Sequence, residues 1–439
     1  MKKPLFALLL IAAAPVSASA PDPASLRSTI EKLVSFGTRH TLSTTTHPTR
    51  GIGAARRWVS SRFEQIGRDC GGCLAVETIG TFTSGPRAPE GVRVEDVIAI
   101  QKGNGDPDRV VIVQAHLDSR VNDVMDATTN APGANDDGSG VALVMEAARL
   151  LSREKFPATI VYAVLSGEEQ GLWGGKLLAD TAKARGWKVA AVLNNDIVGN
   201  THGIGGQHVD DRVRVFSEGI ETAADAAGIK QQRAIGGEDD SPSRALAKAI
   251  VRIAGANKGI GLDVVAVRRP DRFQRGGDHT PFLEAGFPAV RFSEATENYD
   301  RQHQTVRTEN GRQYGDTIDF VDFPYLSRVT TLNIAVLREL ASAPAAPGGV
   351  SIAGALSDDT RVTWQPVPEA AAYRVRWRRA DGIAWTDHRD VPAANASLDL
   401  RHVNIDDHVF GVSALAATGA ESLVTFAGVP PRATPGSSK

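Results

Sequence analysis

The segment Arg109-Val110-Val111-Ile112-Val113-Gln114, which leads into Ala115-His116-Leu117-Asp118, decides the fold of this 439-residue chain. Its continuous apolar run predicts a strand that is buried on both faces, as strands of a parallel sheet are. Similar runs follow at Ala158–Leu165 and Val189–Leu193. Because ligands bind beyond the carboxyl ends of the strands in such sheets, the polar residues that follow these runs are the first candidates for a functional site.

Helical patterns alternate with strand patterns along the first 340 residues. Further strands are expected at Val92–Gln101, Leu262–Val267 and Ala289–Phe292. Helices are expected at Ala24–Phe36, Ile52–Ile66, Gly138–Leu151, Gly171–Ala184, Ser241–Ala254 and Val321–Leu340. This alternation predicts an α/β fold with a mostly parallel central sheet flanked by helices, which we assign to a domain of residues 21–340.

The pattern changes after residues 341–349, whose small residues, prolines and glycines are typical of a linker. Beyond it, Tyr373, Val375 and Trp377 alternate with arginines, which predicts a half-buried strand. Short strands at this spacing predict a small antiparallel β-sandwich over residues 350–429, and this segment resembles a fibronectin type III-like domain. Residues 430–439 are expected to be a disordered tail.

The N-terminus has the features of a secretory signal. Lys2 and Lys3 precede an apolar run and then Ala18-Ser19-Ala20, so residues 1–20 are expected to be a signal peptide. An uncleaved anchor is the alternative, but the apolar run is shorter than the ~20 residues that a membrane helix needs. We therefore expect an exported protein, periplasmic or extracellular, with no membrane span in the mature chain.

The chain has two cysteines, Cys70 and Cys73. A structural zinc site would need further Cys or His residues nearby at matching spacing, and a thioredoxin-like redox pair is a second alternative. In an oxidising compartment a small local disulfide is favoured.

The composition narrows the function classes. With 42% hydrophobic and 23% charged residues, the chain is typical of a soluble globular protein and not of a disordered, collagen-like or polytopic membrane protein. The 49 basic and 51 acidic side chains give no electrostatic reason to expect nucleic acid as a partner. A monomer is favoured.

Acids and histidines follow the predicted strands. His116, Glu168-Glu169 and Asp196 each come directly after a buried strand, and Asp136 and Asp137 share a glycine-rich turn before a helix. One acid suffices to cap a helix, whereas two adjacent acids repel each other unless a cation compensates them. Histidine with several carboxylates suits catalytic zinc, often as a two-metal site, and manganese or cobalt can use the same ligands.

The motifs His116-x-Asp118, Asn135 to Gly140, Glu168-Glu169, Asp196 and His303 occur in an order that resembles the co-catalytic zinc exopeptidases related to secreted bacterial leucyl aminopeptidase, metallopeptidase family 28. The resemblance covers about residues 25–340. It implies the zinc exopeptidase fold, two zinc ions and peptide substrates. The implied metal ligands are His116, Asp136, Glu169, Asp196 and His303, with Asp136 bridging the two ions.

Further roles are implied by the same resemblance. Glu168 is the expected general base, which takes a proton from water and delivers it to the leaving amine, and Asp118 is expected to orient His116. Asp278 and His279 match a segment near the pocket and are expected, with Tyr299, to contact substrate rather than metal.

An aminopeptidase is the favoured activity. The alternatives are a carboxypeptidase, a single-zinc glutaminyl cyclase on the same fold, and a dimeric zinc amidohydrolase with a lid domain. The interval from Asp196 to His303 leaves little room for such a lid. A non-catalytic binding protein is disfavoured, because such proteins usually lose ligands or the base, and here all six positions are filled.

Overall fold

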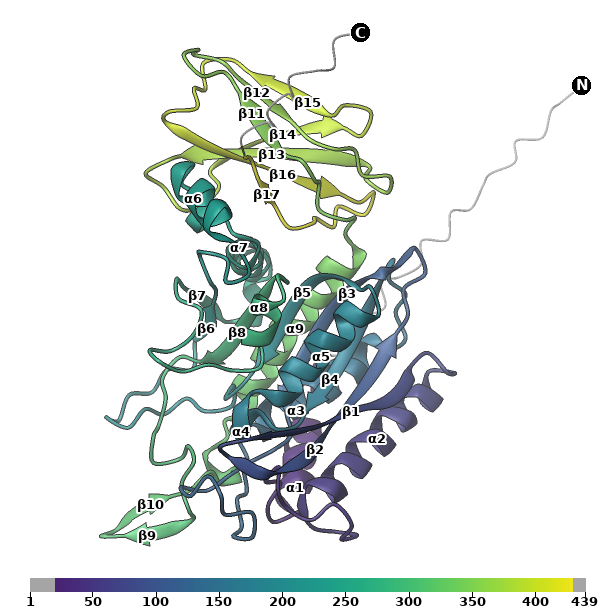
Figure 1. Ribbon diagram of the computed structural model, residues 1–439, viewed down its shortest axis with the longest axis vertical. Coiled ribbons are helices and arrows are strands. Elements are labelled where there is room, and N and C mark those ends of the chain that lie inside the picture. The colour runs from purple at the N-terminus through teal and green to yellow at the C-terminus, as the bar shows by residue number, and fades with distance from the viewer. Residues whose placement is uncertain (1–19, 429–439) are drawn as a thin grey trace, which may run out of the picture.

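The computed structural model describes residues 20–428, and its centre is an eight-stranded mixed sheet (Figure 1). The strand order is β1-β2-β4-β3-β5-β8-β6-β7. The strands are β1 Ala75–Gly85, β2 Ala88–Gln101, β3 Asp106–His116, β4 Ala158–Leu165, β5 Lys188–Asn195, β6 Arg212–Phe216, β7 Asp263–Val267 and β8 Ala289–Glu294. Neighbours from β4 through β3 and β5 to β8 are parallel, as are β6 and β7, whereas β1–β2, β2–β4 and β6–β8 are antiparallel. The predicted mostly parallel sheet is confirmed.

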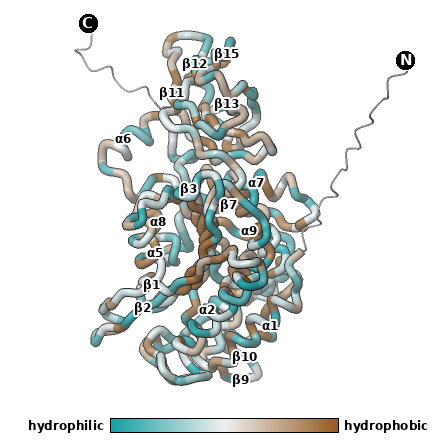
Figure 2. The backbone as a smooth tube through the Cα atoms, turned by 90° about the vertical axis from the view of Figure 1, so that its right-hand side faces the viewer, coloured by the Kyte–Doolittle hydropathy of each residue, from teal (hydrophilic) through white to brown (hydrophobic). Residues whose placement is uncertain are grey.

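Helices cover both faces of this sheet, which explains the continuous apolar runs. Val111 and Val113 of β3 belong to one core, whereas Val110 and Ile112 belong to the core on the opposite face. The first core also takes residues from α1 Pro23–Val34, α2 Gly51–Asp69, α3 Gly138–Leu151, α7 Pro242–Ala256 and α9 Phe323–Ser342. The second takes residues from α5 Trp173–Ala184 and α8 Thr280–Glu284. In Figure 2 the hydrophobic part of the chain accordingly runs through the middle of the molecule.

The structure adds elements that the sequence pattern did not predict. Strands β1 and β6, helix α6 (Ala226–Ala234) and the hairpin of β9 (Arg307–Glu309) and β10 (Arg312–Tyr314) are new. A short helix α4 (Glu168–Gly171) also precedes α5, which corresponds to the predicted helix Gly171–Ala184. Strand β1 lies at the sheet edge and is largely exposed, and α6 has no buried residue. Elements without a buried face carry no apolar periodicity, so the sequence gives little sign of them.

The C-terminal part consists of two antiparallel sheets that lie at one end of the molecule (Figure 1). One sheet has the order β11-β12-β15 and the other β14-β13-β16-β17. The strands are β11 Ser351–Ala353, β12 Thr360–Thr363, β13 Ala372–Arg379, β14 Asp387–Pro392, β15 Ser397–Leu400, β16 His408–Leu415 and β17 Thr425–Phe426. Val362 and Leu400 of the first sheet share an apolar core with Tyr373 and Phe410 of the second, as in a sandwich. The likeness to a fibronectin type III domain and the domain boundaries stay predictions.

The predicted signal peptide and the predicted tail lie at the two ends of the chain. Residues 1–19 of the expected signal peptide and the whole expected tail, residues 430–439, lie outside the described residues. Between residues 20 and 428, no helix combines the length and the apolar character that a membrane crossing needs. The sulfur atoms of Cys70 and Cys73 are bonded to each other, directly after α2.

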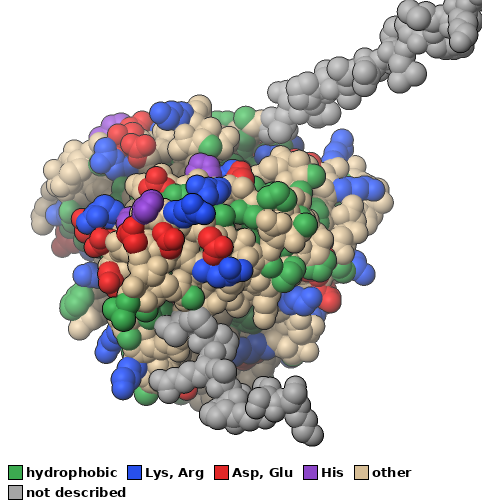
Figure 3. All heavy atoms as spheres, turned by 90° about the horizontal axis from the view of Figure 1, so that it is seen from above, with side chains coloured by type: hydrophobic (Ala, Val, Ile, Leu, Met, Phe, Trp, Pro, Cys, Tyr) green, Lys and Arg blue, Asp and Glu red, His purple; other side chains and the backbone are tan. Residues whose placement is uncertain are grey.

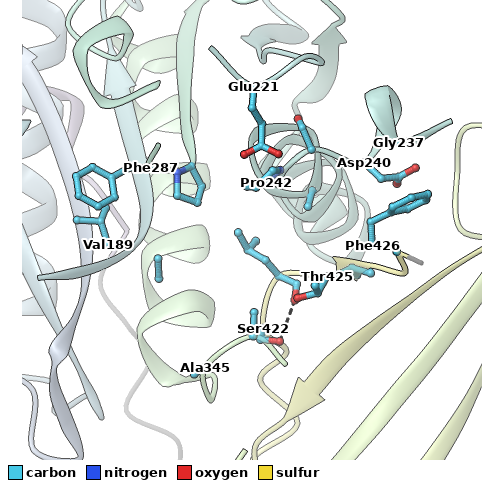
Figure 4. A pocket seen from close by; sticks show the side chains of 18 of the residues that line it. Val189, Glu221, Gly237, Asp240, Pro242, Phe287, Ala345, Ser422, Thr425 and Phe426 are labelled. Atoms are coloured by element: carbon cyan, nitrogen blue, oxygen red, sulfur yellow. Dashed lines mark hydrogen bonds between the residues drawn. The ribbon is translucent and has the colours of Figure 1, made fainter. Parts of the chain in front are cut away.

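A large cavity lies between the C-terminal sheets and the central domain, and residues of both parts line it. Its volume is about 660 Å³. Figure 4 shows Val189 and Phe287 on one wall, Glu221 on another, and Ser422 and Phe426 from the C-terminal part. From the end of the molecule that carries the C-terminal sheets, acidic and basic side chains lie next to one another on the uncovered surface (Figure 3). That face therefore presents neighbouring charges of both signs.

A buried ion pair joins the two parts. Arg378 of β13 donates to Asp240 at 2.5 Å, and both side chains are 3% exposed. Lys248 of α7 donates to the other oxygen of Asp240 at 2.5 Å. Asp240 thus balances two cations that have little access to water.

Asp240→Asn is expected to lower the free energy of unfolding by about 3 kcal/mol, because it leaves buried cations without their anion. Urea denaturation followed by circular dichroism measures the change. The matched control is Asp381→Asn, which breaks the exposed pair with Arg379 (3.1 Å) and should cost at most about 1 kcal/mol. Equal losses in the two variants would contradict the structural role of Asp240.

Candidate metal and catalytic site

The predicted ligands meet at the edge of the sheet where the parallel strands end. His116 is the last residue of β3, and Asp196 follows β5 directly. Glu169 lies in α4, two residues after the Ser166-Gly167 turn that ends β4. Asp136 precedes α3, and His303 lies in the loop after β8. The topology thus collects five side chains that are up to 187 residues apart in the sequence.

These five side chains form two clusters that share Asp136. His116, Asp136 and Asp196 offer ligand atoms that lie within 4.8 Å of one another, and so do Asp136, Glu169 and His303. Oδ1 of Asp136 is 3.2 Å from Nε2 of His116, and its Oδ2 is 3.0 Å from Nε2 of His303. One carboxylate therefore turns one oxygen toward each cluster.

The position of the proton on the His116 ring decides whether Nε2 is available to bind a cation in the first cluster. Its Nδ1 lies 3.0 Å from the carbonyl oxygen of Asp118, which can only accept, so Nδ1 carries a proton. In the neutral ring, Nε2 then presents a lone pair to the carboxylates of Asp136 and Asp196. Nε2 is buried and has no hydrogen-bond partner among the described residues. A metal ion satisfies such converging lone pairs, so this donor set fits zinc.

The second cluster also contains a buried ligand atom that has no hydrogen-bond partner among the described residues. Oε1 of Glu169 is buried and lacks a hydrogen-bond partner within residues 20–428, while Oε2 accepts from Nε of Arg120 at 2.7 Å. Arg120 also donates to Nδ1 of His303 at 2.5 Å. A metal on Nε2 of His303 requires the proton on Nδ1, so Arg120 Nη2 would turn away from Nδ1 when this cluster holds an ion.

Asp118 contacts His116 through its backbone carbonyl, while its carboxylate has other partners. Its carboxylate accepts from the backbone N–H groups of Gly167 (3.0 Å) and Glu169 (3.1 Å) and from the hydroxyl of Thr41 (2.8 Å). The carboxylate lies 3.7 Å from Nδ1 of His116, which is hydrogen-bonded to the Asp118 carbonyl instead. The carboxylate therefore fixes the turn that carries Glu168 and Glu169, and the backbone orients His116.

Two further acids hold the turn around Asp136. Asp137 caps α3 by accepting from the N–H of Gly140 at 3.0 Å, and its other oxygen accepts from the N–H of His116 at 3.2 Å. Asp316 accepts from the N–H of Asp136 at 2.7 Å. The tandem acids therefore have separate tasks: Asp136 faces the clusters, and Asp137 faces the backbone.

The site carries an excess of buried acid. Burial raises the pKa of Asp316 to about 7, and the charge of Asp136 adds to this shift. Burial likewise raises the pKa of Asp278 to about 7, with the charge of Asp118 adding. Bound cations would compensate this excess.

The structure does not bring the three predicted substrate contacts into the cavity at the clusters. Asp278 is buried and accepts from the N–H of Gly175 at 3.1 Å, and His279 is buried and hydrogen-bonds the carbonyl of Pro270 at 2.9 Å. Tyr299 is 56% exposed. None of the three lines the cavity. Their contact with substrate stays a prediction.

Sequence reasoning missed the arginines of the site. Arg291 of β8 is buried and pairs with Asp196 at 2.8 Å, and Arg120 pairs with Glu169. Arg291 stands inside the apolar strand Ala289–Phe292, where a charged residue needs a buried partner, and this signal could have revealed it. Arg120 has no comparable signal, because it lies in a loop.

A cavity of about 430 Å³ opens onto both clusters. Glu168 lines it together with Asp136, Glu169, Asp196 and His303. The cavity at the C-terminal sheets is larger, yet the described residues around it do not include either cluster. Chemistry rather than size therefore singles out the smaller cavity.

Comparisons with known proteins show the family and the fold of this chain. The family model of peptidase family M28 matches residues 96–321. A probable zinc metalloprotease of the fungus Leptosphaeria maculans is 43% identical over 408 residues, covering 92% of this chain and 94% of the relative. The LapA aminopeptidase of Legionella pneumophila is 20% identical with a TM-score of 0.51, covering 73% of this chain and 70% of that one. The glutaminyl cyclase of Porphyromonas gingivalis is 18% identical with a TM-score of 0.51, covering 73% and 99%. At such low identity the two solved structures show a shared fold, and the bacterial type of the exopeptidase stays a prediction.

Proposed function

Because this chain belongs to peptidase family M28, we propose that it is a zinc-dependent exopeptidase with two zinc ions, and specifically an aminopeptidase that releases N-terminal residues from peptides. The observation that carries the proposal is the carboxylate of Asp136, which turns one oxygen to each of two ligand clusters. A shared carboxylate of this kind suits two neighbouring ions better than one.

The five ligands divide between the two ions. His116 and Asp196 would hold the first, Glu169 and His303 would hold the second, and Asp136 belongs to both ligand groups. The chemistry that these residues would gain from bound zinc is Lewis acidity, which would lower the pKa of a water toward about 7 and polarise a peptide carbonyl. Manganese or cobalt can use the same ligands.

Glu168 moves the proton. Its carboxylate lines the cavity beside the ligands and is held there by the turn that Asp118 fixes. Glu168 accepts a proton from the attacking water and donates it to the nitrogen of the leaving amine, so that the carboxylate is regenerated in each turnover. Asp118 is a positioning residue in this scheme.

A panel of aminoacyl-amide and peptide substrates tests the proposal, with and without a chelator and with zinc added back. We expect hydrolysis from a free N-terminus, loss of activity on metal removal and recovery with zinc. Activity that survives thorough metal removal would overturn the proposal. Cleavage of N-blocked substrates would identify a carboxypeptidase, and cyclisation of N-terminal glutamine would identify a glutaminyl cyclase.

We also propose that the protein is exported to the periplasm or the medium. The leader-like residues 1–20 and the bonded pair Cys70–Cys73 support this location, because disulfides persist in oxidising compartments.

A further inference from the structure

The cavity at the two clusters is rich in arginine. Its described lining includes Arg87, Arg120, Arg272 and Arg275, whereas the apolar side chains are Pro86 and Leu172 alone. A pocket for a large apolar side chain is lined mainly by apolar and aromatic residues. This lining therefore disfavours a leucine-like side chain next to the scissile bond and favours an anionic group.

Two of these arginines have their charge engaged by buried acids. Arg120 donates to Glu169 at 2.7 Å. Arg272 is 10% exposed and contacts Asp271 at 3.0 Å and Glu297 at 3.3 Å. Arg120 and Arg272 form part of the cavity wall, and their N–H donors are used largely in ion pairs with carboxylates of the protein.

Among the residues that the structure describes, the other two arginines keep most of their N–H donors free. Arg275 is 34% exposed and makes one ion pair, with Glu297 at 3.0 Å. Arg87 is exposed and donates one N–H to the backbone carbonyl of Glu169 at 2.5 Å, which ties it to the turn at the second cluster. A guanidinium has five N–H donors in a planar fork, so each retains donors that match a carboxylate.

The balance of charge around the cavity also favours an anionic group on the substrate. Behind the cavity, Arg214, Arg272 and Arg275 converge on the single carboxylate of Glu297, and Asp271 is shared by Arg272 and Arg291. The acids that line the cavity are Asp136, Glu168, Glu169 and Asp196. If two divalent ions balance those four acids, the arginine wall carries a net positive charge toward the substrate.

We propose that this cavity selects substrates that carry a carboxylate next to the scissile bond, and that Arg275 and Arg87 bind it. The inference rests on the proposed exopeptidase activity and adds the substrate class. Such a carboxylate has two sources: the side chain of an N-terminal Glu or Asp, or the free C-terminus of a short peptide. Both present the same planar anion to the guanidinium groups.

Paired substrates separate these sources. The first pair is Glu-Ala-Ala-amide against Gln-Ala-Ala-amide, which differ in the side-chain charge. The second is Leu-Ala as the free acid against Leu-Ala-amide, which differ at the C-terminus. We expect kcat/KM to favour the acid about 10–100-fold in at least one pair, the range that charge-assisted hydrogen bonds give.

Arg275→Gln is expected to lower that acid-to-amide ratio about tenfold or more, mainly through KM, and Arg275→Lys to restore part of it. Glu297 keeps Arg214 and Arg272 as partners in these variants, so the fold should persist. Arg87→Gln is the second test. The matched control is Arg379→Gln, which removes an exposed arginine paired with Asp381 at 3.1 Å in the C-terminal sheets and should leave the ratio unchanged.

Equal kcat/KM for acid and amide in both pairs would overturn the inference while leaving the exopeptidase intact. A ratio that Arg275→Gln and Arg87→Gln leave unchanged would also overturn it. Failure to hydrolyse any of the four substrates with zinc present would instead refute the proposed function.

Discussion

Glu168→Gln is expected to lower kcat about 10²–10⁴-fold, the range over which a positioned general acid–base accelerates reactions. Glutamine has nearly the shape of glutamate but cannot accept the proton from water or donate one to the leaving amine. The metal content should stay at the wild-type value, because Glu168 belongs to neither ligand cluster. Steady-state kinetics and elemental analysis by plasma mass spectrometry measure the two quantities.

The control for this variant is Glu64→Gln on the exposed side of α2, where the carboxylate is 52% exposed. It should keep both kcat and metal content. A Glu168→Gln enzyme with a kcat near the wild-type value would remove Glu168 from the mechanism, and a loss of metal would make it a ligand instead of a base.

Asp136→Ala is expected to remove metal from both clusters at once and to lower kcat/KM about 10³-fold or more. One oxygen of this carboxylate faces each cluster, and metal-ion catalysis is worth several kcal/mol of transition-state stabilisation. The wild-type chain should bind two zinc ions, and Asp136→Ala fewer than one. His303→Ala provides the contrast, because it lies in the second cluster and should leave one ion bound.

Unfolding of Asp136→Ala would also release metal, so the stability of the metal-free variant is measured separately. His303 and His116 hold the pKa of Asp136 well below its usual range, so Asp136→Ala is expected to lower the urea midpoint of the metal-free protein, and circular dichroism of the metal-free variant shows whether it still folds. One zinc per wild-type chain would contradict the shared role of Asp136 and favour the single-zinc glutaminyl cyclase. Two ions in Asp136→Ala would remove Asp136 from the ligand set.

Much of the central fold could be predicted because its strands are buried on both faces. The expected strand Ala158–Leu165 and helix Gly138–Leu151 have these bounds in the structure. The sequences of buried elements contain apolar runs or periodic apolar faces, which pattern analysis detects. The edge strand β1 and the exposed helix α6 lack that constraint, and pattern reasoning did not find them.

The candidate site could be predicted in part for a related reason. His116, Glu168-Glu169 and Asp196 follow strands whose direction was already expected, so their meeting at one edge followed from the topology. The task of Asp118 could not be foreseen, because its partners are backbone groups of a turn that is 49 residues away. The arginine wall comes from loops, which have no periodic signal.

The sequence by itself determined the α/β fold and the residue types that gather at the strand ends, since strand burial and strand direction are local consequences of apolar patterning. The tertiary structure alone decided how these side chains divide their work. It turned the two oxygens of Asp136 to different clusters, gave the Asp118 carboxylate to the Glu168 turn, and set Arg275 beside the cavity with free donors. Those features depend on distances between groups that are far apart in the chain, and such distances exist only after the chain has packed.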